Sequence, residues 1–80
     1  MKNKIAIEFG ERLASQRKKK GLLQKELSEL CGFSLNYVGV LERGQKNITL
    51  EKVFVLADQL ECSVYDLIPN ERHTNHKAGC

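Results

Sequence analysis

The segment 24–44, which reads QKELSELCGFSLNYVGVLERG, constrains the fold more than any other part of the chain. Its apolar residues recur at the spacing of two short amphipathic helices, and Gly32 stands between them. Glycine adopts the positive φ of a tight helix-to-helix turn at little cost. Ser34 stands just before the second apolar run, where a helix N-cap is expected. This spacing predicts a helix-turn-helix, whose second helix is suited to the DNA major groove.

The segments around this motif are also expected to be helical, so the predicted fold is an all-α, compact five-helix bundle. Apolar residues recur at helical spacing before Gly21 and again after Thr49, which is a suitable N-cap. Ser63 and Asp66 approximate a capping box at the start of a last short helix. The expected helices cover about 5–20, 24–31 and 35–43, the segment after Thr49, and a short segment between Ser63 and Pro69.

Length and composition indicate one small folded domain. The chain has 80 residues, and its hydrophobic fraction of 41% fits a globular protein. We expect a helix-turn-helix domain over 1–69 and a flexible C-terminal tail over 70–80, which has almost no large apolar groups. No apolar run approaches the ~20 residues of a membrane span, and no signal peptide precedes the domain. The expected location is therefore the cytoplasm, without a membrane partner.

The pattern of reactive side chains predicts neither a metal site nor an enzyme. Cys31, Cys62 and Cys80 are odd in number and match no zinc spacing, so we expect reduced thiols. His73 and His76 near Cys80 lack a framework that would hold a metal. No nucleophile–base set and no glycine-rich phosphate loop is present. We expect no cofactor, no metal, no small-molecule ligand and no catalytic activity.

The net charge of +3 conceals a strong asymmetry along the chain. Residues 1–25 carry eight Lys or Arg and two Glu, whereas 26–80 carry five basic and eight acidic side chains. A positive end suggests a polyanionic partner. The alternative is a solvated helix end, because the run 18–20 of three lysines closes the first helix, where cations favour the macrodipole. The neighbouring helix-turn-helix favours contact with phosphate.

The motifs together resemble the phage-repressor/Cro-like, or XRE-type, helix-turn-helix family over about 7–69. Within it, the stretch from Tyr37 to Thr49 resembles the controller proteins of restriction–modification systems, which are five-helix dimeric regulators. Related stand-alone repressors share much of this pattern. The motifs that carry the resemblance are Arg17, Gly21-Leu22-Leu23-Gln24-x-Glu26-Leu27, Gly32-Phe33-Ser34, Val38-x-x-Leu41-Glu42-Arg43-Gly44, and Leu56-Ala57 with Leu60-Glu61-Cys62-Ser63.

The resemblance implies roles for particular residues. It implies an ion pair between Arg17 and Glu42, which stand late in their helices. It also implies that the start of the second motif helix contacts base edges, while the residues around it, with the basic run that ends the first helix, contact phosphate. The implied base contacts are Leu35, Asn36, Tyr37, Gly39 and Val40. The implied phosphate contacts are Arg17, Lys20, Gln24, Ser34, Arg43, Lys46, Asn47 and Thr49.

The second helix of the motif departs from the family by being poor in polar side chains. Asn36 is its one amide and suits adenine, and Leu35 or Val40 suits a thymine methyl group. Tyr37 either contacts a base edge or a phosphate, or packs at the domain edge. Specificity is therefore expected to depend partly on DNA shape and half-site spacing.

The functional prediction is a homodimeric transcriptional regulator that binds a pseudo-palindromic operator in double-stranded DNA. Two dimers on one operator and a contact with RNA polymerase are further partner expectations. A stand-alone phage- or plasmid-type repressor remains an alternative, as does an antitoxin-like module that binds a protein. The polar-poor start of the second motif helix would suit the latter. The expected dimer interface comprises Leu60, Val64, Tyr65, Leu67 and Ile68.

Overall fold

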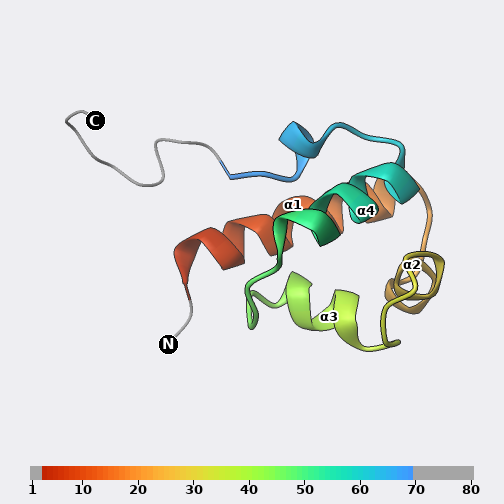
Figure 1. Ribbon diagram of the computed structural model, residues 1–80, viewed down its shortest axis with the longest axis horizontal. Helices are drawn as coiled ribbons and strands as arrows, with labels where there is room; N and C mark the ends of the chain where they lie inside the picture. Colours follow the sequence, from red (N-terminus) through yellow and green to blue (C-terminus); the bar gives the residue numbers. More distant parts are fainter. Residues whose placement is uncertain (1–2, 70–80) are drawn as a thin grey trace.

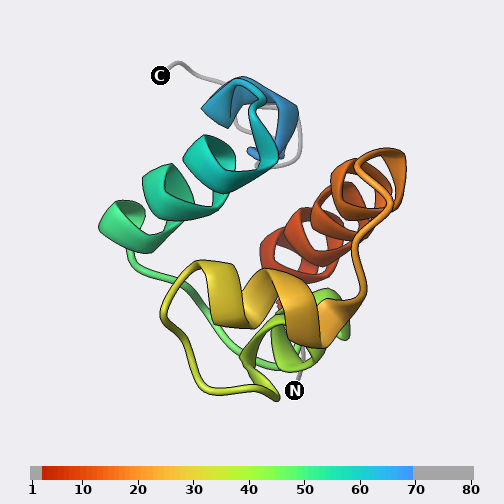
Figure 2. The same cartoon turned by 90° about the vertical axis from the view of Figure 1, so that its right-hand side faces the viewer.

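Four α-helices and one 3-10 turn form the part of the chain, residues 3–69, that the computed structural model describes. The helices α2 and α3 lie on one side of α1 and α4, and the 3-10 turn follows α4 (Figures 1 and 2). Helix α3 packs against both α1 and α2. The all-helical expectation is confirmed. The helices are α1, Lys4–Lys19; α2, Gln24–Leu30; α3, Tyr37–Glu42; and α4, Leu50–Leu60; the 3-10 turn is Val64–Asp66.

The expected fifth helix is wrong, because the chain forms only the 3-10 turn there. The capping box is nonetheless present: Ser63 Oγ accepts a hydrogen bond from the Tyr65 N–H at 3.0 Å, and Asp66 Oδ2 accepts one from the Ser63 N–H at 3.0 Å. Pro69 disfavours helical backbone at Ile68, so too few residues remain for an α-helix. The segment expected to be a tail, 70–80, lies outside the described residues.

Helix α3 begins two residues later than the sequence suggested. Residues 34–36 form a turn in which the Tyr37 N–H donates to the Ser34 carbonyl at 3.0 Å. The N-cap is Asn36, so the expected capping role of Ser34 is wrong. A side chain from the preceding helix supplies the cap instead, because Ser28 Oγ accepts a hydrogen bond from the Val38 N–H at 3.1 Å. The turn itself follows Gly32, whose φ of +75° matches the expectation.

The core lies where the four helices meet, and it contains residues that had been expected at a dimer interface. Leu60 is 3% exposed and Leu67 is fully buried in the same cluster. Neither side chain offers free surface, so their expected place at an interface is wrong. The other fully buried large side chains are Leu13, Leu27, Val38, Leu41 and Leu56. Among the described helices, none is long and apolar enough to cross a membrane.

Gly10 marks the closest approach between α1 and α3. A Cβ atom there would lie 2.4 Å from the Leu41 carbonyl oxygen and 2.7 Å from that of Glu42. Both neighbours are backbone atoms, which cannot rotate away as a side-chain end would. The missing side chain therefore lets α1 pack directly on the end of α3.

Replacing Gly10 by Ala tests this contact. Helix propensity alone would make the variant about 1 kcal/mol more stable. We expect the clash to dominate and to lower the free energy of unfolding by ~1–3 kcal/mol, as overpacking does. Urea denaturation measures the change, with Ser15→Ala on the exposed side of α1 as the control. An increase in the stability of Gly10→Ala would contradict the close approach.

Candidate nucleic-acid interface

A buried ion pair joins α1 to the end of α3. Arg17 Nε donates to Glu42 Oε2 at 2.6 Å, and Arg17 Nη2 donates to Glu42 Oε1 at 3.1 Å. The third part of the guanidinium fork, Nη1, donates to the Leu22 carbonyl at 2.7 Å. The two side chains are only 10% and 7% exposed. The ion pair implied by the family resemblance is thus present in the structure.

This arrangement leaves Arg17 no role at the DNA surface. Its guanidinium is buried and each of its nitrogens donates to a protein oxygen. The hydrogen bond with Glu42 raises the pKa of Arg17 above its usual value, although burial opposes that shift. The implied phosphate contact of Arg17 is therefore wrong, since phosphate would have to displace a buried carboxylate.

Gln24 connects the start of α2 to the same carboxylate. Its Nε2 donates to Glu42 Oε1 at 2.8 Å. Glu42 consequently binds α1 through Arg17 and α2 through Gln24, and it holds α3 against both helices. The side chain of Gln24 is half-buried, and it forms part of a surface hollow described next.

The hollow lies beside α3 and gathers four of the five implied base-contacting residues. Its volume is about 240 Å³. Leu35 and Asn36 stand on its rim in the exposed turn before α3, rather than within the helix as expected. Gly39 contributes no side chain, so the hollow remains open there. The lining residues are Gln24, Lys25, Leu35, Asn36, Gly39, Val40 and Arg43.

Tyr37, the fifth implied base contact, packs within the domain. Its ring meets the Phe33 ring edge-on, with centroids 4.9 Å apart, and Lys52 Nζ lies 4.8 Å from the Tyr37 centroid. This arrangement corresponds to the packing alternative at the domain edge. Lys52 itself was not anticipated. It comes from α4, whereas the aromatic pair lies before and at the start of α3. No local sequence pattern indicates that a lysine will contact aromatic rings so far away in the chain.

Some of the implied phosphate contacts already form a side-chain hydrogen bond within the described residues, and others do not. Lys20 donates to Glu61, and Thr49 Oγ1 accepts a hydrogen bond from the Lys52 N–H at 3.3 Å as the cap of α4. Arg43 Nε donates to Gln45 Oε1 at 3.1 Å. Ser34, Lys46 and Asn47 are exposed. Among the described residues these last three form no side-chain hydrogen bond, so a phosphate would displace no such bond in contacting them.

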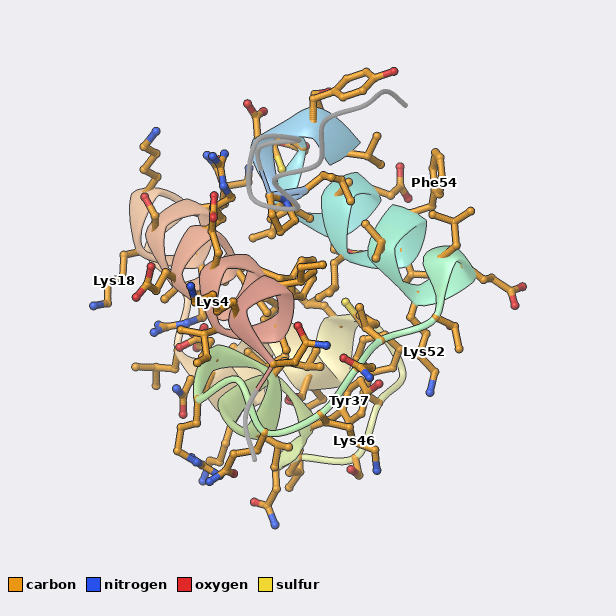
Figure 3. All side chains as sticks on the ribbon, turned by 90° about the vertical axis from the view of Figure 1, so that its left-hand side faces the viewer. Lys4, Lys18, Tyr37, Lys46, Lys52 and Phe54 are labelled. Atoms are coloured by element: carbon orange, nitrogen blue, oxygen red, sulfur yellow. The ribbon has the colours of Figure 1, made fainter. Side chains whose placement is uncertain are left out.

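The lysines near this interface lie on different sides of the molecule. Figure 3 shows Lys46 and Lys52 on the same side of the picture as Tyr37, whereas Lys18 projects at the opposite edge. In this view Lys18, near the end of α1, is therefore well separated from Lys46 in the loop after α3. The positive charge that contacts Tyr37 is Lys52 Nζ from α4, 4.8 Å from the ring centroid.

The two cysteines among the described residues are free thiols. Burial raises the pKa of Cys31 to about 11, and burial also raises that of Cys62. Both therefore stay protonated at neutral pH, which disfavours metal binding and nucleophilic attack. Within residues 3–69, no group of three or more His, Cys, Asp or Glu could hold a metal ion. The tail residues His73, His76 and Cys80 lie outside the described part.

The helix-turn-helix family HTH_3 matches residues 13–67, which is most of the described fold. The chain belongs to this helix-turn-helix family. The match includes the ion pair, the hollow and both motif helices. The resemblance to XRE-type proteins is thereby confirmed, and the chain is a DNA-binding helix-turn-helix transcriptional regulator.

Relatives of this helix-turn-helix protein include named regulators. It is 39% identical over 59 residues to the uncharacterized HTH-type transcriptional regulator y4dJ of Sinorhizobium fredii, covering 74% of this chain and 77% of the relative. It is 33% identical over 69 residues to the control protein C.SmaI of Serratia marcescens, covering 86% and 82%. The structure of the restriction-modification controller protein C.AhdI from Aeromonas hydrophila superposes with a TM-score of 0.78 at 38% identity, covering 82% and 100%.

Removing Glu42 tests the ion pair of this helix-turn-helix protein. Glu42→Ala would leave the Arg17 charge buried without its partner, so we expect a loss of ~3–5 kcal/mol in the free energy of unfolding. Denaturant titration followed by circular dichroism measures it. Glu61→Ala is the matched control, because the Lys20–Glu61 pair is exposed and its loss should leave the unfolding midpoint nearly unchanged. Equal midpoints for both variants would show that the buried pair is dispensable.

Proposed function

We propose that the protein is a controller of a restriction–modification system, which acts as a homodimer on a pseudo-palindromic operator. The similarity to C.AhdI, which the chain covers over its whole length, carries this proposal. The similarity to C.SmaI supports it independently. The exposed turn before α3 and the hollow beside it supply the surface that would face base edges in the major groove.

Base contact and phosphate contact are assigned to different residues within this proposal. Asn36 lies on the rim of the hollow and is exposed, and its amide suits adenine N6 and N7. Leu35 and Val40 provide apolar surface for a thymine methyl group. Lys46 and Asn47, in the loop after α3, are assigned to phosphate. The few polar groups leave part of the specificity to DNA shape and to the spacing of half-sites.

Two substitutions separate these roles on duplexes selected by the wild-type protein from a randomised pool. We expect Asn36→Ala to weaken binding to selected duplexes by ~1–3 kcal/mol and binding to random DNA very little. We expect Lys46→Ala to weaken binding to all duplexes alike and to lower the salt slope by about one unit. Fluorescence anisotropy over a range of salt concentrations measures both effects.

Lys18→Ala is the matched control for Lys46→Ala, because Lys18 projects at the opposite edge of the molecule (Figure 3). Failure to enrich any DNA sequence would refute the operator proposal and favour the antitoxin-like interaction module. Enrichment without a methyltransferase and an endonuclease gene beside the gene for this chain would favour a stand-alone repressor.

Homodimerisation is proposed through the outer face of α4 and the segment after it. Of the residues expected there, Tyr65 is 81% exposed and Ile68 is 37% exposed, while Val64 is half-buried. Phe54 and Leu50 on α4, which the sequence analysis did not include, are 56% and 69% exposed. Several large exposed apolar side chains along one helix and the segment after it are typical of an interface. A two-fold dimer would place two copies of α3 toward successive major grooves.

We expect sedimentation equilibrium at micromolar concentration to give about twice the monomer mass. Tyr65→Glu would place a charge in the proposed interface and should shift the protein toward the monomer. Lys18→Ala, an exposed change on α1 that removes a charge at the opposite edge from Phe54 (Figure 3), is the control for a general effect of substitution. A monomeric wild-type protein that binds DNA without cooperativity would refute the dimer.

A further inference from the structure

The buried network determines which end of the Gln24 amide points away from the core. A carboxylate paired with a guanidinium only accepts hydrogen bonds, so the amide atom that faces Glu42 is the donor Nε2. The other atom, Oε1, is then an acceptor. Reversing the amide would place two acceptors against each other. Through Glu42, the ion pair with Arg17 thus fixes which end of Gln24 points away from the core.

Gln24 Oε1 is open to solvent and has no hydrogen-bond donor within residues 3–69. Every buried side-chain nitrogen or oxygen among these residues has a partner, and no donor to Oε1 is present, so the atom must be accessible. It faces the hollow beside α3: a Cβ atom at Gly39 would lie only 3.0 Å from it. The absence of a side chain at Gly39 is what leaves the approach to this acceptor free.

A donor stands beside this acceptor. Arg43 Nη1 lies 3.3 Å from the same Cβ position, and Nε of this guanidinium is oriented by Gln45. The hollow therefore presents an acceptor and a cationic donor that both lie next to Gly39. Adenine offers the complementary pair in the major groove, with the N6 amino group as donor and N7 as acceptor. A cytosine–guanine pair also does, through cytosine N4 and guanine O6 and N7.

We infer that Gln24 Oε1 accepts a hydrogen bond from the exocyclic amino group of a base in the major groove, and that Gln24 is a specificity-determining residue. This inference rests on the DNA binding proposed above. It concerns Oε1 and is distinct from the phosphate contact that the family resemblance implied for Gln24. Phosphate oxygens are acceptors only, so they cannot bind Oε1, whereas the second N–H of Nε2 is able to donate to one while the first binds Glu42.

The test removes single amino groups from a duplex selected by the wild-type protein. Each adenine in turn is replaced by unsubstituted purine, and each cytosine by 2-pyrimidinone, so the two arms distinguish N6 from N4. Wild-type protein and Gln24→Met are compared on every duplex. At one position per half-site, we expect removal of the amino group to weaken wild-type binding about 3–10-fold and Gln24→Met binding hardly at all. At all other positions, both proteins should lose equally, because weaker base pairing affects them alike.

Two further variants make the result specific to the acceptor. Gly39→Ala retains Gln24 and its bond to Glu42 but covers Oε1, so it should lose the same discrimination as Gln24→Met. Gln59→Met, on α4 and away from the hollow, should behave as wild type. Equal unfolding midpoints of Gln24→Met and wild type would exclude a folding defect. If Gln24→Met is less stable, the comparison of Gly39→Ala with wild type decides the result.

The outcomes separate this inference from the proposed function. Loss of affinity by Gln24→Met on all duplexes alike, with no position where the two proteins differ, would make Gln24 a backbone contact and overturn the inference, while DNA recognition stands. Equal responses of wild type and both variants at every position would also overturn it. A wild-type protein that enriches no sequence would refute the proposed function itself, and the inference with it.

Discussion

The buried carboxylate of Glu42 is the interaction on which the arrangement of the three N-terminal helices depends. It lies at the end of α3 and is bound by Arg17 from α1 and by Gln24 from α2. A buried ion pair adds little net stability over apolar packing, yet it requires one geometry because its hydrogen bonds are directional. The apolar core holds α3 against its neighbours. The hydrogen bonds of Glu42 determine the orientation of α3 and direct Oε1 of Gln24 outward.

The elements with strong local signals were predictable from the sequence. Gly32 indicated the turn, and Thr49 indicated the start of α4, because each requirement is met by one residue and its immediate neighbours. The ion pair of Arg17 with Glu42 was available only through the family resemblance. The two residues are 25 positions apart, and no periodicity connects them.

The errors came from features that depend on tertiary packing. Apolar spacing could not tell whether Leu67 faces the core of its own domain or a second copy, because both environments require the same residue type. A charged residue such as Arg17 looks the same in sequence whether it is buried against a carboxylate or exposed toward phosphate. The orientation of the Gln24 amide likewise follows from partners on other helices, so no reading of the α2 sequence alone would give it.

The bond from Ser28 to the first turn of α3 has a consequence for how such a protein can change. Because Ser28 of α2 supplies the side-chain cap, the loop between the two helices contributes only backbone carbonyls to the start of α3. The side chains of Leu35 and Asn36 therefore have no structural role at the start of α3, and they can be replaced without loss of the helix. New binding preferences can arise there by single substitutions while the scaffold stays the same. Because different residues cap the helix and face the DNA, the binding preference of such a regulator can change while its fold is kept.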